Sequence, residues 1–426
     1  MGREPAFAPR DARLPSSSPL SPKDRERAQT IVGEIARTLV RLPPPLDGDP
    51  DLATSLMSRE PGCSLFYAYL HRVEPRAAWH RQGVRHLERA IARVPNQSRK
   101  PFFSYGFSGT AWALEHLDGW FIDVPADMNR DVDGALLTLV DEAPTLSFDL
   151  HYGLVGFGIY AVERLPARAA RRLLERILAR LERMAEPHAG GLRWRVVNAE
   201  WVEGEGVAAA LAGGVYLHGL LNGVAGVVGL CGAAIHHGVD ARRARRLLEG
   251  ALTWMWKTRE DGLFPARAQM SLLEGSLGVA AVARVAARAA RLPTWEARAL
   301  AILRRLAALR GAAARTPAAS IGAGLAGAAY VFHRASVETG EPLLGAAARH
   351  FAHLLIRRRR PGRGLCGYSV WSPYWQRRYL GDPDYPVGWI GVPGFSDGVA
   401  GIGLVLLQLL RGGSSDWDRA FLLSYR

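Results

Sequence analysis

A short glycine motif recurs along the chain, each time directly before an apolar stretch with helical spacing. The motif is one variable residue followed by Gly-x-x-Gly, and six copies are intact. Their variable residues are, in chain order, Tyr105, Tyr152, Asn222, Glu274, Ala323 and Asp397. A seventh, degraded copy precedes the stretch CSLFYAYL and has Arg59 in place of the first glycine. The copies recur about every 47 to 74 residues, a period that fits one helical hairpin per repeat.

The segments between the motifs are amphipathic and rich in Arg, Ala and Leu. Residues 171–184 and 297–309 carry apolar side chains at three- and four-residue spacing, which is typical of helices with one buried face. Each repeat therefore supplies an inner apolar helix and an outer charged helix. About seven such hairpins are stable together if they close into a ring. We predict an all-α fold, an α/α toroid formed by a single domain over 23–426, after a disordered tail over 1–22.

The glycines have two expected roles in this arrangement. The first permits close backbone approach and unusual dihedral angles at a helix start, and the second, one turn later, lets a neighbouring helix pack tightly. The variable residue before them then lies near the N-terminus of an inner helix and faces the centre of the ring. The alternative is that these residues are only local helix caps.

The chain is basic, with 54 Lys and Arg against 40 Asp and Glu and a formal net charge of +14. Such an excess suggests an anionic partner, namely nucleic acid, an acidic peptide or a membrane surface. Most of the arginines are scattered over the outer faces of the amphipathic segments, a pattern typical of solvated helices. The one dense run, Arg357 to Arg360, is short, and no nucleic-acid-binding motif accompanies it. We therefore expect no nucleic-acid partner and only a minor steering role for the charge.

The three cysteines, Cys63, Cys231 and Cys366, are too few and too far apart for a disulfide framework or a Cys-pair zinc site. A reducing compartment fits this usage, and the N-terminal residues lack the apolar core of a secretory signal. The uncharged stretch 206–239 is long enough to span a bilayer, but glycines, histidines and Asn222 interrupt it. We predict a buried helix pair there, no membrane span and a cytoplasmic protein.

At these repeats the sequence resembles the lanthionine cyclase C family, the lanthipeptide cyclases and their eukaryotic relatives, over about residues 50 to 412. The resemblance rests on the seven repeats and their spacing. It implies an α/α toroid with a zinc ion at the ring centre. It also implies addition of a peptide cysteine thiolate to dehydroalanine or dehydrobutyrine, with a precursor peptide as substrate and a dehydratase as partner.

Transfer of the family's site residues onto this chain gives a different set of side chains. The zinc-ligand positions fall on Leu273, Gly322 and Ala323, and the acid/base histidine falls on Asn222. Only the family's aspartate has a counterpart, Asp149. Zinc needs three or four Cys, His or carboxylate ligands, so we predict no metal site, no cofactor and no stoichiometric zinc in the purified protein.

Two functions remain open, and the sequence does not decide whether the chain is an enzyme. In the first, a cyclase-like protein of lanthipeptide-type modification binds a precursor peptide in a central cavity, with zinc-dependent cyclisation lost. In the second, a zinc-independent acid/base enzyme, for example one like a glycoside hydrolase, uses central carboxylates. The candidate catalytic residues are Asp149, Asn222, Glu274 and Asp397.

Aromatic and arginine side chains are the usual anchors of protein interfaces, and they gather in the two longest gaps between motifs. Together with the tyrosines of two motifs they give the candidate peptide-binding residues, which are Tyr105, Tyr152, Trp371, Trp375, Arg377 and Arg378. Loops that contain Pro and Gly would present the second group at a rim. The alternative is an aromatic cluster that plugs the ring.

Overall fold

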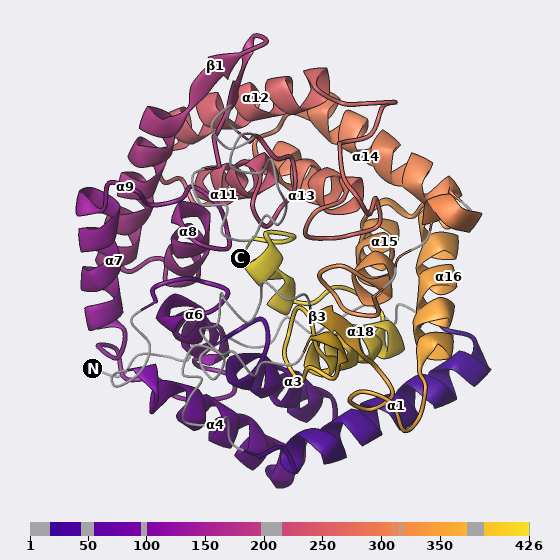
Figure 1. Cartoon of the computed structure of the whole chain (residues 1–426). Helices are drawn as coiled ribbons and strands as arrows, with labels where there is room; N and C mark the ends of the chain where they lie inside the picture. The colour runs from indigo at the N-terminus through magenta and orange to yellow at the C-terminus, as the bar shows by residue number, and fades with distance from the viewer. Residues whose placement is uncertain are drawn as a thin grey trace.

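A computed structural model describes residues 18–43, 55–94, 100–196, 215–309, 311–314, 316, 318–372 and 387–425. Its helices form two concentric rings, so the predicted α/α toroid is confirmed (Figure 1). The inner ring consists of α3 (Glu60–Val73), α6 (Phe107–Leu117), α8 (Leu154–Glu163), α11 (Val224–His236), α13 (Ser276–Ala289), α15 (Leu325–Thr339) and α18 (Val399–Arg411). The outer ring consists of α4 (Ala77–Ile91), α7 (Arg130–Glu142), α9 (Arg168–Met184), α12 (Ala241–Lys257), α14 (Pro293–Ala308), α16 (Pro342–Arg358) and α1 (Pro22–Val40).

The ring closes through the N-terminal helix. Helix α1 packs on α18 and α16, so it provides the outer partner that the last inner helix would otherwise lack. The packed chain begins at Ser18, earlier than the predicted tail boundary at residue 22. The Ser18 hydroxyl donates to the carbonyl oxygen of Leu409 at 2.8 Å, and Leu20 is buried. These contacts hold the start of α1 against the end of α18.

Each inner helix begins at the first glycine of its motif because the backbone is crowded there. The N-cap glycines of α6, α8 and α18 have φ of −176°, −156° and −113°, so no unusual dihedral angle is needed. The reason is steric. A Cβ on the second glycine would meet the carbonyl oxygen six residues earlier, at 1.7 Å for Gly278 and Leu272 and at 1.8 Å for Gly401 and Phe395. The motif thus lets the preceding loop fold back onto the first turn of its helix.

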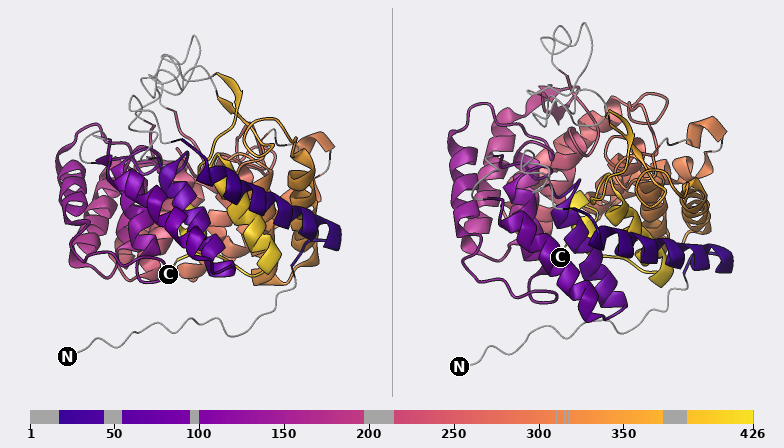
Figure 2. Two further views of the ribbon diagram at one scale, coloured as in Figure 1. Left: turned by 90° about the horizontal axis from the view of Figure 1, so that it is seen from below. Right: turned by 60° about the horizontal axis from the view of Figure 1, so that its bottom comes forward.

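Two small antiparallel hairpins decorate the toroid. Strands β1 (Glu186–His188) and β2 (Gly191–Arg193) follow α9, and β2 packs on α12. Strands β3 (Val370–Ser372) and β4 (Gly388–Ile390) pair with Trp371 opposite Trp389. The second hairpin stands out from one face of the ring, and the C-terminus lies at the opposite face (Figure 2).

The C-terminal segment fills the centre of the ring at that opposite face, where Figure 1 shows the short helix η2 (Trp417–Phe421) surrounded by the inner helices. The Trp417 ring lies 4.3 Å from that of Tyr330 and is almost fully buried. Asp418 accepts hydrogen bonds from Tyr330 and Arg334 of α15. The short 3-10 helix η1 (Gly311–Ala314) lies after α14. No helix in the described part of the chain is both long enough and apolar enough to cross a bilayer.

Candidate functional site

The loops that precede the inner helices join into a ring of their own at one end of the toroid. Six backbone N–H to carbonyl hydrogen bonds link neighbouring loops: Met57 to Ser104 at 3.4 Å, Ser396 to Met57 at 2.9 Å, Gly322 to Ser396 at 3.0 Å, Leu273 to Gly322 at 3.0 Å, Leu221 to Leu273 at 3.0 Å, and His151 to Leu221 at 3.2 Å. The remaining pair of loops is joined by an edge-to-face contact between Tyr105 and His151, with ring centroids 5.3 Å apart. We name this set of loops the loop ring.

The loop ring brings the variable residues of all the motifs to one end of the molecule. Each inter-loop hydrogen bond uses the residue directly before a variable residue or its equivalent in the next repeat. The sequence analysis did not single out these bonding residues. Their fixed register before each motif was a signal that could have identified them.

Asp149 and Asn222 are in direct contact, although they lie 73 positions apart. The Asn222 amide donates to the Asp149 carboxylate at 3.3 Å, and the Ser147 hydroxyl and the Tyr152 backbone N–H donate to the same carboxylate at 3.0 and 2.7 Å. Burial raises the pKa of Asp149 to about 6, although these donors favour the charged form. The carboxylate fixes the loop before α8, and its partner is an amide that cannot exchange a proton at neutral pH.

Asp397 and Glu274 form the second pair of predicted residues. Burial raises the pKa of Asp397 to about 6, a hydrogen bond from the Ser396 hydroxyl opposes the shift, and the negative charge of Glu274 adds to it. Glu274 itself is exposed. Asp397 also lines a cavity of about 10 Å³ with Val370 of β3, room for about one water molecule. The structure therefore puts a proton-holding acid beside a solvated carboxylate, at the foot of the β3–β4 hairpin.

Replacing Asp397 with asparagine should change how stability depends on pH. A raised pKa means that the folded protein keeps a proton that the unfolded chain releases, so stability present below pH 3.8 is lost as the pH rises to about 6. We expect Asp397→Asn to equal the wild type near pH 4 and to exceed it at pH 8 by about 1 to 2 kcal/mol in the free energy of unfolding. Urea unfolding at both pH values measures this difference, and parallel pH profiles for the two proteins would contradict it.

The two candidate tyrosines are mostly buried. Tyr105 is 8% exposed, and its hydroxyl accepts a hydrogen bond from Ser58 at 3.4 Å. Tyr152 is 7% exposed and packs edge-to-face on Phe102 with ring centroids 5.3 Å apart. Both rings therefore help to build the floor of the loop ring, and only a small part of each faces outward.

The candidate rim residues fall partly outside the described residues. Trp375, Arg377 and Arg378 belong to this group. Trp371 is described, is 58% exposed and lies edge-to-face with Trp389, which is 54% exposed, at a centroid distance of 5.8 Å. Two large apolar rings in water, side by side on one hairpin, form a surface that favours contact with a partner.

The positions of the family's zinc ligands are adjacent in the fold, but their side chains cannot bind a metal. Leu273 and Gly322 share a backbone hydrogen bond, and Ala323 follows directly. A Cβ built on Gly322 would lie 2.7 Å from Cδ1 of Leu273 and 2.5 Å from Oγ of Ser396. The leucine side chain thus fills the space beside the glycine. The donor set at these positions does not fit zinc.

The remaining histidines and cysteines have structural contacts. His218 stacks on Trp254 at 4.6 Å and hydrogen-bonds Thr258, and His333 bonds the Gly413 carbonyl. All three cysteines are free and buried, and burial raises the pKa of Cys231 above its usual value. Within the described ranges, no group of three or more His, Cys, Asp or Glu side chains is arranged to hold a metal.

The chain matches the model of the "Lanthionine synthetase C-like protein" family over residues 51–422, so it belongs to this family. Among solved structures, nisin cyclase is similar, with a TM-score of 0.70 and 14% sequence identity. The similarity covers 95% of this chain and 98% of the nisin cyclase chain, and at this identity it shows the fold. No curated protein matches the sequence. The predicted family is thus confirmed, and the match extends past the predicted limit at residue 412.

Proposed function

We propose that this chain is a cyclase-like protein of lanthipeptide-type modification that binds a precursor peptide over the loop ring without zinc-dependent cyclisation. The observation that carries the proposal is the packing of Leu273 against Gly322, where the family has two zinc-binding cysteines. A free thiol has a pKa near 8.5, so about a few per cent is thiolate at neutral pH without a metal. The carboxylates of Glu274 and Asp397 would raise that pKa further.

Peptide binding draws support from the surface above the loop ring. The Trp371 and Trp389 rings are exposed on a hairpin whose foot reaches Asp397, so a peptide held by the rings would pass the predicted centre. A dehydratase, which makes the dehydrated residues of such a precursor, is the partner that this function requires. Three free cysteines agree with a cytoplasmic setting.

The test uses a synthetic, fluorescein-labelled peptide with one dehydroalanine and one cysteine. We expect it to bind the protein and to cyclise no faster than in buffer, which thiol alkylation and mass spectrometry measure. Cyclisation joins sulfur to the β-carbon and moves the thiol proton to the α-carbon, so the mass stays constant and one alkylation site is lost. Protein-dependent loss of that site would refute the proposal.

The hairpin tryptophans provide the binding prediction. We expect Trp371→Ala with Trp389→Ala to weaken binding of the dehydroalanine peptide about tenfold or more, since buried Trp anchors dominate many interfaces. Fluorescence anisotropy measures the change. Trp120→Ala is the control, because Trp120 is 38% exposed but follows the C-terminal end of an inner helix, at the other end of the ring. Equal effects of the two variants would count against a peptide site at the hairpin.

A second candidate function is acid/base catalysis without zinc, supported by the proximity of Asp397 to Glu274. One protonated and one ionised carboxyl group is the arrangement that glycoside hydrolysis uses. Glu274→Gln and Asp397→Asn would each abolish such turnover on nitrophenyl glycosides while leaving peptide binding unchanged. Absence of turnover in the wild type excludes this alternative for those substrates.

A further inference from the structure

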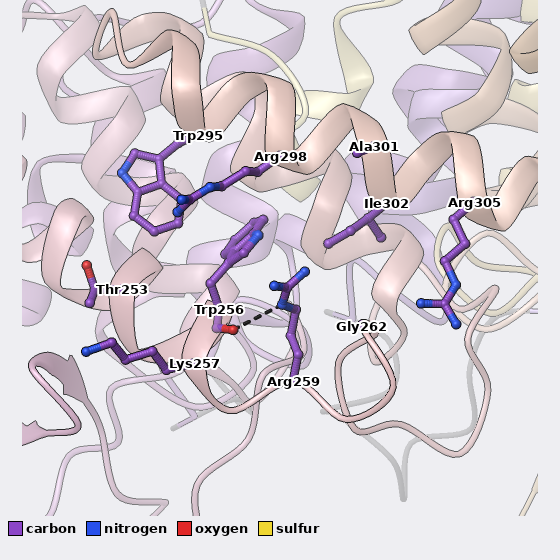
Figure 3. A pocket seen from close by; sticks show the side chains of 10 residues that line it. All are labelled: Thr253, Trp256, Lys257, Arg259, Gly262, Trp295, Arg298, Ala301, Ile302 and Arg305. Atoms are coloured by element: carbon purple, nitrogen blue, oxygen red, sulfur yellow. Dashed lines mark hydrogen bonds between the residues drawn. The ribbon is translucent and has the colours of Figure 1, made fainter.

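A pocket of about 640 Å³ opens on the outer helical layer, where the C-terminal end of α12 meets α14 (Figure 3). Its volume is in the range of small-molecule and side-chain binding sites. The pocket lies outside the loop ring and uses none of the residues discussed so far. Two tryptophans and four cations dominate its lining: Trp256, Trp295, Lys257, Arg259, Arg298 and Arg305.

The positive charges of this pocket have no carboxylate partner in the described part of the chain. Elsewhere on the outer layer arginines are paired, as Arg243 is with Glu182 at 2.8 Å and Arg304 with Glu341 at 2.6 Å. Arg259 and Arg305 instead donate to backbone carbonyls, those of Trp256 and Asp261. No acidic side chain lines the pocket. An anion would therefore meet several uncompensated cations at once.

The tryptophans hold these cations in place and add an apolar wall. The Arg298 guanidinium lies 4.8 Å from the centroid of the Trp295 ring, and that of Arg259 lies 5.7 Å from the Trp256 ring. The two indoles are in edge-to-face contact at 5.3 Å. Trp256 is 7% exposed, and its buried Nε1–H has no hydrogen-bond partner in the protein. Figure 3 shows both rings, Arg298 and Ile302 facing the same space.

We propose that this pocket binds an acidic peptide segment, with carboxylates on the arginines and lysine and one apolar side chain against the two tryptophans. The inference rests on the proposed function, because it assigns an acidic part of the peptide substrate to the outer layer while the reacting part reaches the loop ring. A long nucleic acid fits less well. Glu260 and Asp261 are exposed beside the pocket and would repel a continuous line of phosphates.

The probe is a fluorescein-labelled dodecapeptide of four Glu-Leu-Asp units, with the Gln-Leu-Asn peptide as its uncharged counterpart. We expect the acidic probe alone to bind, and binding to weaken as NaCl is raised from 50 to 300 mM. The variant Lys257→Glu with Arg298→Glu should weaken binding about tenfold or more, because both residues are exposed and each reversal replaces attraction by repulsion.

The matched control is Arg172→Glu with Arg242→Glu, which changes the net charge by the same amount at exposed outer-layer positions away from the pocket. It should retain the affinity of the wild type within about threefold. Equal weakening by the control, or no binding of the probe, overturns the inference and leaves the hairpin experiment unaffected. Displacement of the probe by ATP or by a DNA duplex at lower concentration than by unlabelled peptide overturns the peptide assignment. Trp371→Ala with Trp389→Ala should leave probe affinity unchanged, which separates this site from the proposed function.

Discussion

Gly278→Ala is expected to destabilise the toroid by about 3 kcal/mol or more, at the upper end of the cost of overpacking. The new Cβ would lie 1.7 Å from the carbonyl oxygen of Leu272 and 2.6 Å from its carbonyl carbon. Backbone atoms cannot rotate away as a side chain can, so the loop before α13 must move. That loop carries Leu273, whose N–H and carbonyl both bond to neighbouring loops. Urea unfolding followed by circular dichroism measures the loss.

Gly134→Ala is the control for this substitution. Gly134 lies inside the outer helix α7, is exposed, and has no atom within 4 Å of the position of a new Cβ. Alanine should therefore stabilise the protein by about 0.5 to 1 kcal/mol, through helix propensity alone. If the two variants had similar stabilities, close approach would not be the reason for glycine in the motif.

The arrangement of the helices followed from the repeat because each motif repeats the same physical problem. The spacing of Gly106, Gly153 and their equivalents located the starts of the inner helices, and the amphipathic stretches located the outer ones. Closure by α1 could not be predicted, since no motif precedes it. The packing of Trp417 and Asp418 in the centre was also missed, because a single non-repeated segment gives no periodic signal.

The candidate site was predictable in register but not in function. The sequence placed Asn222 and Asp149 at matching positions of two repeats, and the structure joins them by a hydrogen bond. It gave no indication that Asp397 is buried beside the exposed Glu274, since burial depends on packing between repeats. The pocket of Trp256 and Trp295 was missed as well. Its residues lie on two outer helices, and each alone reads as an ordinary amphipathic face.

Restoring the family's ligand set should create a zinc site in this chain. We expect Leu273→Cys, Gly322→Cys and Ala323→His together to raise the zinc content from below about 0.1 to about one ion per chain, since two thiolates and an imidazole suffice for a site with one open position. The first two positions already share a backbone hydrogen bond of 3.0 Å. The leucine side chain, 2.7 Å from the position of the new Cβ, is removed by the same variant. The Ser396 hydroxyl can turn to another staggered rotamer.

Elemental analysis after dialysis measures the zinc content, and a melting curve with and without added zinc gives a second readout, because binding to the folded state alone raises its stability. The matched control is Leu273→Cys with Ala323→His, which leaves Gly322 in place and supplies only two ligands, too few for a stable site. Stoichiometric zinc in the wild type would mean that other side chains bind it and would overturn the proposed loss of the metal. A triple variant that folds but stays free of zinc would show that the loop ring has diverged beyond these three side chains. Uptake by the triple variant alone would instead attribute the loss to Leu273, Gly322 and Ala323, on a backbone that still has the geometry of a metal site.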